Sequence, residues 1–309
     1  MHLWQRPSES RIDVVVCTYR RPVLLAQLIE AIQAQRLSGL RVRLIVVDND
    51  PDGSARQVVE RASAQDAPVA LCYVAEPRCN IALARNAGLN ACNADFIALI
   101  DDDELPAVDW LSNLMAVAMR YAAGLVFAPV LPVFHPDAPR WLTEGGFFDR
   151  PRHATGTAVP LLEARTGNVL IRGSLLVASP LRFDPRLGLS GGEDYAFFRA
   201  LYPSCQRAVW CDEAAVSESV PLARTNPRWL LKRSFRIGSV EASLARRGMT
   251  PHSPPMLVLK TIYLAAKLCL DLVRAPLWPR ARRLKSWRQG AIAVGLAYGL
   301  LFGVYREYK

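Results

Sequence analysis

Four consecutive acidic residues, at positions 101–104, directly follow the apolar segment 96–100. A short apolar segment between polar residues is typical of a buried parallel strand. We therefore expect the carboxylates at the C-terminal end of a strand, where open α/β sheets bind their ligands. Clustered carboxylates raise one another's pKa unless a cation lies among them, and all-oxygen ligands favour Mg²⁺ or Mn²⁺. The alternative is a solvated acidic loop.

A second acidic pair, Glu193 and Asp194, follows two glycines, Gly191 and Gly192. The pair comes directly before a segment, 195–201, that we expect to be helical. Acids at a helix N-terminus are favourable in any protein, which is one explanation for the pair. The other is a positioned general base.

Polar residues also follow the first two predicted strands. Thr18, Tyr19 and Arg20 follow the first strand, and Asp48 and Asn49 follow the second. Such residues suit simple turns, but they also suit contacts to a nucleotide. No GxGxxG follows the first strand and no GxxxxGK[ST] occurs, which disfavours a dinucleotide site and a P-loop.

Strand-like and helix-like segments alternate through the first 130 residues. Strands are expected at 12–17, 42–47, 69–74, 95–100 and 125–130, and helices from residue 22 and at 54–64, 81–92 and 110–121. This alternation predicts βαβ units and a mostly parallel α/β sheet flanked by helices. Residues 131–165 lack periodicity and are expected to form a long functional loop. Ordered structure is expected again from about 168 to 220.

The charge of the 309-residue chain is unevenly distributed. Residues 1–223 carry 21 arginines and 25 acids, a net charge of −4, whereas residues 224–309 carry 17 basic and 3 acidic residues, a net charge of +14. We expect a catalytic domain at 1–223 and a basic, helical, membrane-associating appendage at 224–309. A basic block binds something anionic. Nucleic acid is disfavoured because long aliphatic stretches interrupt this block.

The C-terminal part contains two apolar segments. In 255–278 the four charged residues lie within about 60° on a helical wheel, which predicts an amphipathic helix. A basic linker at 280–288 precedes the uncharged segment 291–305, which at 15 residues is too short to span a bilayer. Small residues recur there every fourth position and would admit another helix. In-plane helices, a re-entrant hairpin, a homodimer interface and ordinary core-covering helices all remain open.

The seven cysteines are odd in number and form no CxxC. We expect reduced, mostly buried thiols in a cytosolic protein and no zinc site. Residues 1–10 are polar, so we expect no secretory signal peptide.

Taken in order, these motifs resemble the inverting family 2 glycosyltransferases of GT-A fold. The resemblance covers about residues 12–220. Its parts are Cys17-Thr18-Tyr19, Val47-Asp48-Asn49, Ala84-Arg85-Asn86-Ala87-Gly88, the pair Asp101 and Asp103, and Gly192-Glu193-Asp194. The segment 229–236 further resembles bacterial exopolysaccharide-building members.

The resemblance implies a role for each motif. Asp194 would be the catalytic base, with Glu193 beside it. Asp103 and Asp101 would form the metal–diphosphate site with Mg²⁺ or Mn²⁺, with Asp103 favoured as the direct ligand. The family often has a small residue where this chain has Asp102, which leaves open which carboxylate touches the metal. The positions implied in nucleotide-sugar binding are Thr18, Tyr19, Arg20, Asp48, Asn49, Arg85, Asp101 and Asp102.

The resulting hypothesis is a metal-dependent inverting transferase of cell-surface polysaccharide synthesis. It would move a sugar from a nucleotide-diphosphate sugar, with UDP the favoured nucleotide, to a saccharide or a polyprenyl-diphosphate-linked saccharide. Loop 131–165 would close over the acceptor, with Trp141 or Phe147 stacking on a sugar. The other acceptor or diphosphate candidates are Gly192, Lys232, Arg233 and Arg236.

The expected location is the cytoplasmic face of a bacterial inner membrane, where the protein would attach peripherally to an anionic surface. Two alternatives remain: a sugar-nucleotide nucleotidyltransferase and a non-catalytic membrane scaffold.

Overall fold

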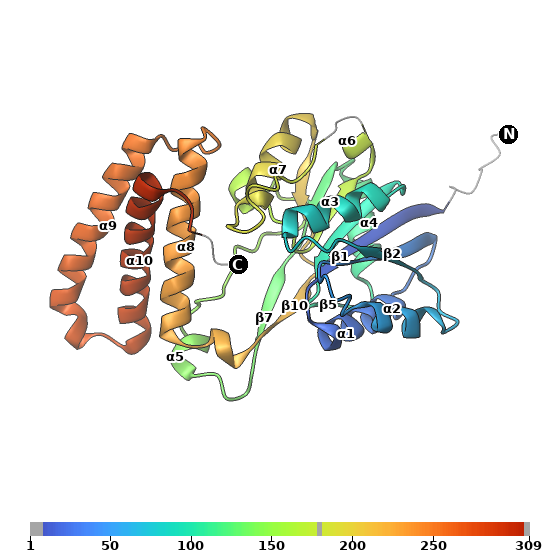
Figure 1. Cartoon of the computed structure of the whole chain (residues 1–309), viewed down its shortest axis with the longest axis horizontal. Coiled ribbons are helices and arrows are strands. Elements are labelled where there is room, and N and C mark those ends of the chain that lie inside the picture. Colours follow the sequence, from blue (N-terminus) through green and yellow to red (C-terminus); the bar gives the residue numbers. More distant parts are fainter. Residues whose placement is uncertain (1–8, 178–180, 306–309) are drawn as a thin grey trace. The chain divides into compact units, whose positions relative to one another are not determined.

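The structure is a computed structural model that describes residues 9–177 and 181–305. Its main sheet has seven strands in the order β3-β2-β1-β4-β8-β6-β9 (Figure 1). Strands β1 to β4 are mutually parallel, and β8 runs antiparallel to both β4 and β6. The predicted α/β class with a mostly parallel sheet is confirmed. The strands are β1 (Ser10–Thr18), β2 (Leu40–Asp48), β3 (Ala70–Ala75), β4 (Phe96–Asp101), β6 (Leu125–Phe127), β8 (Val169–Arg172) and β9 (Ala208–Trp210).

Helices cover both faces of this sheet because the strand residues alternate between two apolar clusters. Val14 and Val16 of β1 pack in one cluster with residues of α1 and α4, whereas Val15 packs in the other with residues of α3 and α7. This is the period of two that a strand buried on both faces requires. The helices are α1 (Pro22–Gln33), α2 (Arg56–Ser63), α3 (Ile81–Ala91), α4 (Trp110–Arg120) and α7 (Glu193–Leu201).

The strand expected at 125–130 is two strands, β6 and β7 (Val130–Phe134), separated by Ala128 and Pro129. Proline lacks the N–H that a central strand needs. The side chain of the buried Asn168 satisfies backbone carbonyl groups at this break, because its Nδ2 donates to the carbonyl oxygens of Pro129 and Ala214. Strand β7 belongs to a three-stranded sheet, in the order β5-β10-β7, with β5 (Glu104–Pro106) and β10 (Val216–Val220).

The expected structureless loop 131–165 is therefore partly ordered, which corrects the sequence prediction. It contains most of β7, a short helix α5 (Arg140–Thr143) and the 3₁₀ turn η1 (Leu161–Glu163). The remaining short elements are α6 (Ser174–Val177), η2 (Tyr202–Ser204) and η3 (Leu222–Arg224).

Contacts divide the chain into two compact units. The first contains Met1–Leu131, Arg150–Pro185 and Glu193–Glu218, and the second contains Pro132–Asp149, Arg186–Gly192 and Ser219–Lys309. All of the predicted C-terminal part, 224–309, belongs to the second unit. That unit also takes 132–149 and 186–192 from within the predicted catalytic part, so the chain passes between the units several times.

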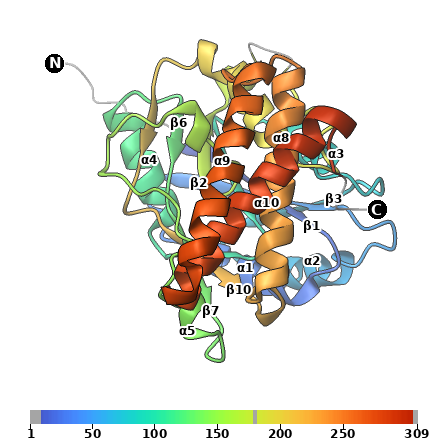
Figure 2. The same ribbon diagram turned by 90° about the vertical axis from the view of Figure 1, so that its left-hand side faces the viewer.

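Three long helices dominate the second unit: α8 (Pro227–Arg246), α9 (Pro254–Arg274) and α10 (Arg280–Phe302). Helix α10 lies between α8 and α9 (Figures 1 and 2). The short turn η4 (Ala275–Leu277) links α9 to α10. The predicted basic linker 280–288 is wrong, because these residues form the first turns of α10. Pro279 starts this helix, and arginine and lysine are good helix formers. Within the described ranges no helix has the length and apolar character needed to cross a bilayer.

The small residues of α10 do admit another helix closely. A Cβ on Gly299 would lie 2.6 Å from the carbonyl oxygen of Ser239, and Gly295 sits directly against the backbone of Phe235. Both contacts are with α8, so the helix admitted here belongs to the same chain rather than to a second copy.

All seven cysteines are free thiols. Cys211 is buried, but Cys79 and Cys269 are exposed and the other four are half-buried. The expectation of mostly buried thiols is therefore wrong, because several of the cysteines lie on loops or outward helix faces.

Candidate active site

Strand register brings the polar strand ends to one edge of the sheet. In the parallel pairs, Thr18 of β1 lies opposite Asp48 of β2, and Cys17 lies opposite Asp101 of β4. The carboxyl ends of three adjacent strands therefore meet at the position where α/β sheets bind ligands. The acid run lies at this edge, as its sequence predicted.

Asp102 forms hydrogen bonds with two side chains, one at the end of β1 and one in the turn after it. Its carboxylate is 5% exposed and accepts hydrogen bonds from Thr18 Oγ1 at 2.8 Å and from Arg21 Nη1 at 2.7 Å. Burial raises the pKa of Asp102, while Arg21 and Thr18 oppose this shift. Arg21 Nη1 also donates to Asp103 Oδ2 at 3.2 Å. Thr18 and Asp102, both expected at the nucleotide, are thus hydrogen-bonded to each other, and their contact with a nucleotide stays a prediction.

Asp101 lines a recess together with Arg85 and Thr166. About half of its side chain is accessible, compared with 12% for Asp103. Its surroundings limit hydration and raise its pKa to about 6; Arg85 opposes this shift, and Asp103 and Asp194 add to it. The Asp101 N–H donates to Glu104 Oε2 at 3.0 Å, and burial followed by Asp101 raises the pKa of Glu104 well above its ordinary value. Asp101 is therefore the most accessible of the four acids.

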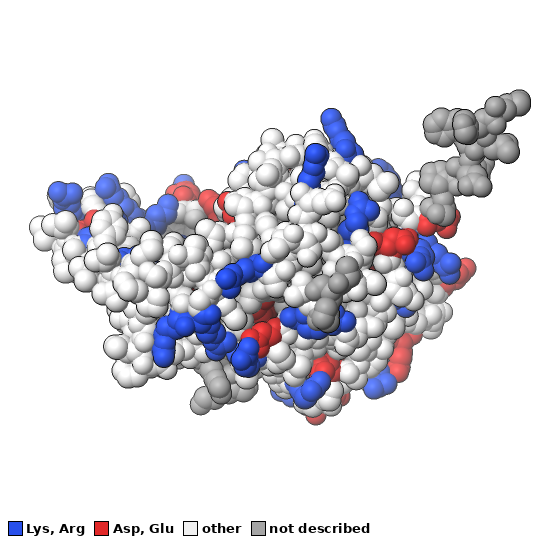
Figure 3. Space-filling model, turned by 90° about the horizontal axis from the view of Figure 1, so that it is seen from above, with Lys and Arg blue, Asp and Glu red and all other residues white. Residues whose placement is uncertain are grey.

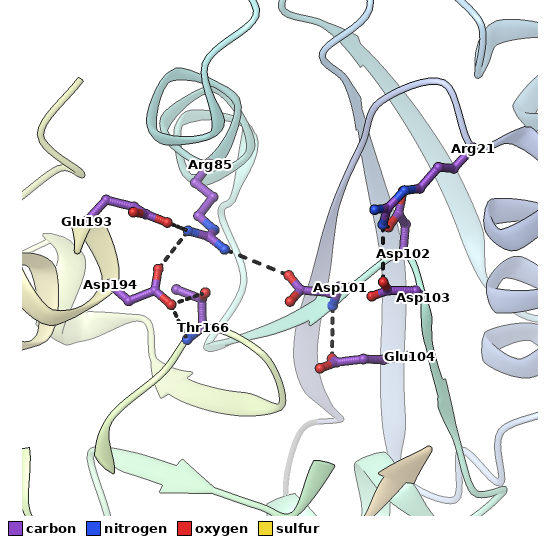
Figure 4. A network of polar contacts seen from close by, with 9 residues as sticks. All are labelled: Arg21, Arg85, Asp101, Asp102, Asp103, Glu104, Thr166, Glu193 and Asp194. Atoms are coloured by element: carbon purple, nitrogen blue, oxygen red, sulfur yellow. Dashed lines mark hydrogen bonds and ion pairs between the residues drawn. The ribbon is translucent and has the colours of Figure 1, made fainter. Parts of the chain in front are cut away.

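Arg85 connects the acid run to the second acidic pair (Figure 4). Its Nη1 donates to Glu193 Oε1 at 2.8 Å and to Asp194 Oδ1 at 2.7 Å, and its Nη2 lies 3.8 Å from Asp101 Oδ1. Burial disfavours the charge of Arg85, but Asp194 and Glu193 more than offset this and raise its pKa. Acidic groups more than 90 residues apart in the chain thus share one guanidinium.

Local sequence explains why Arg85 reaches this position. The side chain of Asn80 caps α3 by accepting from the N–H groups of Ala82 and Leu83. Gly88 lets α3 approach the sheet, because a Cβ there would collide with Val15 of β1. Arg85, three residues before Gly88, is therefore held over the carboxyl edge of the sheet.

The second acidic pair opens α7. Asp194 Oδ2 accepts from Thr166 Oγ1 at 3.0 Å, so Arg85 and Thr166 together fix this carboxylate. Glu193 is 8% exposed, and burial, followed by the charge of Asp194, raises its pKa to about 7. Its Oε2 has no hydrogen-bond partner among the described residues. The pair is thus divided into a fixed, partly accessible Asp194 and a buried Glu193.

A thiol does not supply the nucleophile here. Cys17 lines the same recess as Arg85, Asp101 and Thr166. Burial raises the pKa of Cys17 to about 12, so the thiol stays protonated at neutral pH.

Asp48 and Asn49 form hydrogen bonds that stabilise the neighbouring loops. Asp48 Oδ2 accepts from the Ala55 N–H at 2.8 Å and from Tyr73 Oη at 3.0 Å. Asn49 Nδ2 donates to the carbonyl oxygens of Glu76 and Arg78 at 2.7 Å each. Both side chains are buried, and their predicted contact with a nucleotide stays a prediction.

Tyr19 and Arg20 are exposed beside these loops. Arg20 Nη2 donates to Asp52 Oδ2 at 2.8 Å, and its guanidinium lies 5.2 Å from the centre of the Tyr19 ring. The predicted contact of Tyr19 and Arg20 with a nucleotide stays a prediction.

The remaining candidates lie in the second unit. Trp141 packs edge-on against Phe147, and Arg233 lies over the rings of Phe148 and Trp229. Gly192 has φ 91°, and a Cβ there would press on Val240 and Leu244, both of α8. Arg236 also lies on α8. Their roles toward an acceptor stay predictions.

Sequence reasoning missed three residues of the first unit. Arg21 and Thr166 support the acidic groups, and Arg165 lines a second recess with Arg150 and Trp210. Burial, followed by Arg150, lowers the pKa of Arg165. Arg21 directly follows the predicted site residue Arg20 and could have been noticed, whereas nothing local to 165–166 signals proximity to Asp194.

The residues at this edge suit a metal that is shared with a ligand. No group of three side chains among the described residues forms a ready-made metal site. Mg²⁺, however, is commonly held by one or two carboxylates together with substrate phosphates and water. Asp101 and Asp103 provide that partial set.

The fold and this edge define a class: an α/β protein with paired carboxylate groups at the ligand-binding end of a parallel sheet. Residues 13–168 match Glycosyl transferase family 2. The chain is also 39% identical to the succinoglycan biosynthesis protein ExoM of Rhizobium meliloti over 243 residues, 77% of this chain and 76% of the relative. The chain belongs to glycosyl transferase family 2, and the resemblance inferred from its motifs is confirmed.

More distant matches extend over nearly the whole chain. The glucosyl-dolichyl phosphate glucuronosyltransferase of Haloferax volcanii is 24% identical over 94% of this chain and 96% of its own. The mannosyltransferase PcManGT of Pyrobaculum calidifontis, solved with GDP-Man and Mn²⁺, has a TM-score of 0.64 at 18% identity, covering 96% of this chain and 88% of that one. Residues 1–349 of S. aureus TarS, solved with UDP-GlcNAc, match with a TM-score of 0.56 at 14% identity. The match covers 93% of this chain and 91% of that one. These likenesses confirm the GT-A fold.

Proposed function

We propose that the protein transfers a sugar, with inversion, from a nucleoside-diphosphate sugar to a hydroxyl of a saccharide or lipid-linked saccharide acceptor in exopolysaccharide synthesis. The observation that carries this proposal is the Arg85 network, which joins a candidate base to the acid run at the ligand edge of the sheet. The ExoM relative supports the pathway, and the nucleotide-sugar complex of TarS supports a UDP-sugar.

Asp101 and Asp103 would hold a divalent metal together with the donor diphosphate. When bound, that ion would neutralise charge on the departing diphosphate. A Mn²⁺ complex among the structural neighbours supports this assignment. Asp101, the more accessible carboxylate, is the better placed of the two to meet an incoming ligand.

Asp194 would take the proton from the acceptor hydroxyl as that oxygen attacks the anomeric carbon. Arg85 and Thr166 fix the two carboxylate oxygens of Asp194 at 2.7 and 3.0 Å. Such fixation positions a base before the acceptor arrives. A single displacement by the acceptor oxygen inverts the anomeric configuration, which can be read from the product by NMR.

Donor recognition can be tested without knowing the acceptor. We expect UDP with Mn²⁺ or Mg²⁺ to raise the melting temperature, because a ligand bound only to the native state stabilises it by about 2.7 kcal/mol at 100 times its Kd. GDP and ADP serve as comparisons. No shift with any nucleotide diphosphate would contradict a nucleotide-sugar enzyme.

Asp194→Asn should keep the UDP-induced shift in melting temperature and lose nearly all sugar transfer. The amide cannot accept the hydroxyl proton, and loss of a general base costs about 10²- to 10⁴-fold. Incorporation of labelled sugar from UDP-glucose into a membrane lipid extract is the assay. Wild-type turnover by the variant would remove Asp194 from this role.

The alternatives have lost support, because the chain belongs to a glycosyltransferase family. A nucleotidyltransferase would exchange pyrophosphate into the nucleotide sugar, so absence of that exchange separates the two enzymes. A scaffold would bind UDP without transferring sugar.

A further inference from the structure

Helix α9 presents its charged side chains to its neighbours. Lys260 Nζ donates to both carboxylate oxygens of Glu241 on α8, at 2.6 and 2.9 Å. Asp271 Oδ2 accepts from Ser286 Oγ of α10 at 2.7 Å and from Lys267 Nζ at 3.2 Å. The narrow polar stripe of α9 therefore lies along its contacts with α8 and α10, where its charges are paired although the two lysine side chains stay 38–39% exposed.

The opposite face of α9 is exposed and apolar. Leu259, Tyr263 and Leu270 are 64–68% exposed, and Val273 is 82% exposed. Lys260, Lys267 and Asp271 are the only Lys, Arg, Asp or Glu residues between 254 and 273, so this outward face carries none. The other exposed large side chains of this face are Val258, Ile262 and Leu272, and Leu277 follows in η4.

A continuous face of this kind marks an interaction surface. Its helix is about 30 Å long at 1.5 Å per residue, and no described helix can span a bilayer. An amphipathic helix of this type binds in the plane of a membrane interface.

The charges at both ends of the face indicate which kind of partner binds it. Arg246 and Arg247 are exposed before α9, Arg274 is exposed at its last position, and Arg280 and Arg282 are exposed after it. The acids described in 224–305, Glu241 and Asp271, are both paired inside the layer. Figure 3 shows a largely uncharged surface over the C-terminal helices with Lys and Arg toward its margins. A second copy would bring cationic ends against cationic ends, whereas anionic headgroups complement them.

We propose that α9 binds an anionic lipid bilayer, with its apolar face among the acyl chains and the arginines at its two ends against lipid phosphates. Exposed Tyr263 and Trp287 suit the headgroup level. This surface lies outside the Arg85 network and needs neither donor nor acceptor, so its failure and a failure of sugar transfer can be told apart.

Co-sedimentation of the full chain with vesicles tests the proposal. We expect binding to vesicles of phosphatidylcholine with 30% phosphatidylglycerol, and much weaker binding to phosphatidylcholine alone or at about 0.5 M salt. Arg274→Gln with Arg282→Gln should lower the partition coefficient by about fivefold for each lost charge.

Leu259→Glu with Leu270→Glu should abolish binding, because two carboxylates would enter the apolar layer and face anionic lipid. The matched control is Met119→Glu with Leu162→Glu, which makes the same charge change at two exposed apolar positions of the first unit. The control should bind like wild type. A cooperative thermal unfolding transition near the wild-type melting temperature verifies that each variant is folded.

Exposed Cys269 lies on the same outward face and offers a second readout. In a Cys79→Ser background, an environment-sensitive dye on Cys269 should shift to the blue when anionic vesicles are added. Failure of wild type to bind, unchanged binding by the α9 glutamate variant, or no dye shift would overturn the proposal. So would a lipid-independent dimer that the α9 variant converts to monomer.

Discussion

Arg85 shows how a single cation can organise several acids. It is buried between Asp101 on one side and the Glu193–Asp194 pair on the other, and removal of a partner from a buried charge network is costly because uncompensated charges remain. The network therefore has two functions in the proposed reaction: it keeps the base oriented, and it limits repulsion among the acids before a metal or diphosphate arrives.

Arg85→Lys should reduce sugar transfer by roughly 10²-fold or more while the protein stays folded. Lysine keeps the charge but cannot hold Glu193, Asp194 and Asp101 with one planar group. Comparison of kcat and KM checks the interpretation, because a positioning role lowers kcat more than it raises the KM for donor. A change confined to the KM would instead place Arg85 on the nucleotide.

Glu193 predicts a pH dependence of stability. Its folded pKa is raised to about 7 from an ordinary value of 4.5, so the folded chain holds this proton more tightly than the unfolded chain does. The stability from this group is complete below about pH 4.5 and is lost as the pH rises through 7, by at most about 3 kcal/mol.

Glu193→Gln should remove that dependence, since the amide does not titrate and still offers an oxygen to Arg85. The measurement is the free energy of unfolding in urea from pH 5 to 8. The wild-type curve should fall relative to the variant's curve across this range. Parallel curves would show that Glu193 stays ionised in the folded chain.

At the scale of elements, glycines set how closely helices approach their neighbours. Gly88 seats α3 on the sheet and so places Arg85, while Gly295 and Gly299 seat α10 on α8. The loss of stability when such a glycine is replaced by alanine depends on the atoms that the added methyl group contacts. Backbone cannot move aside cheaply, whereas a flexible side chain can.

Gly295→Ala should therefore destabilise the protein by about 1–3 kcal/mol, because its Cβ would meet the backbone of Phe235. Gly290→Ala is the matched control on the same helix, since the atoms nearest its Cβ belong to the flexible side chain of Leu268 and the substitution brings the same gain in helix propensity. Thermal and urea unfolding compare the two. Equal stability of both variants would mean that α8 and α10 adjust freely.

At the scale of the whole molecule, the chain does not divide cleanly at residue 223. Leu142, Phe147 and Phe148 precede that point, yet they cluster with Leu230 and Leu284, which follow it. Phe148 also stacks on Trp229 at 5.8 Å between ring centres. A catalytic part cut at 223 would lose the residues that cover these aromatics.

A truncated chain of residues 1–223 should melt at a lower temperature than the full chain and should bind a hydrophobic dye. The reason is the exposure of the 134–148 aromatic cluster, which buries its rings on α8 and α10. Calorimetry and dye fluorescence, with the full chain as the reference, provide the test. A cooperative transition at the wild-type temperature would instead support 1–223 as an independent domain.

Local pattern determined much of this protein. Apolar segments between turn residues specified β1 to β4 and the helices that join them, because burial on both faces of a parallel sheet leaves a direct signature in sequence. The ordered motifs specified the family. The sequence prediction missed the break at Pro129 and the helical start of α10, although each has a local proline signal; hydrogen bonds from Asn168 and packing on α8 stabilise these features in the fold.

Only the tertiary structure decided which partner each of the clustered acids contacts. The sequence places Asp101 to Glu104 together, but it is Arg21 and Thr18 that engage Asp102, and Arg85 that ties Asp101 to Asp194. Likewise, the helical wheel of α9 is visible in the sequence, but the direction of its polar stripe is not. Periodicity records which residues share a face, whereas the direction of that face is decided by the distant side chains that pack against it.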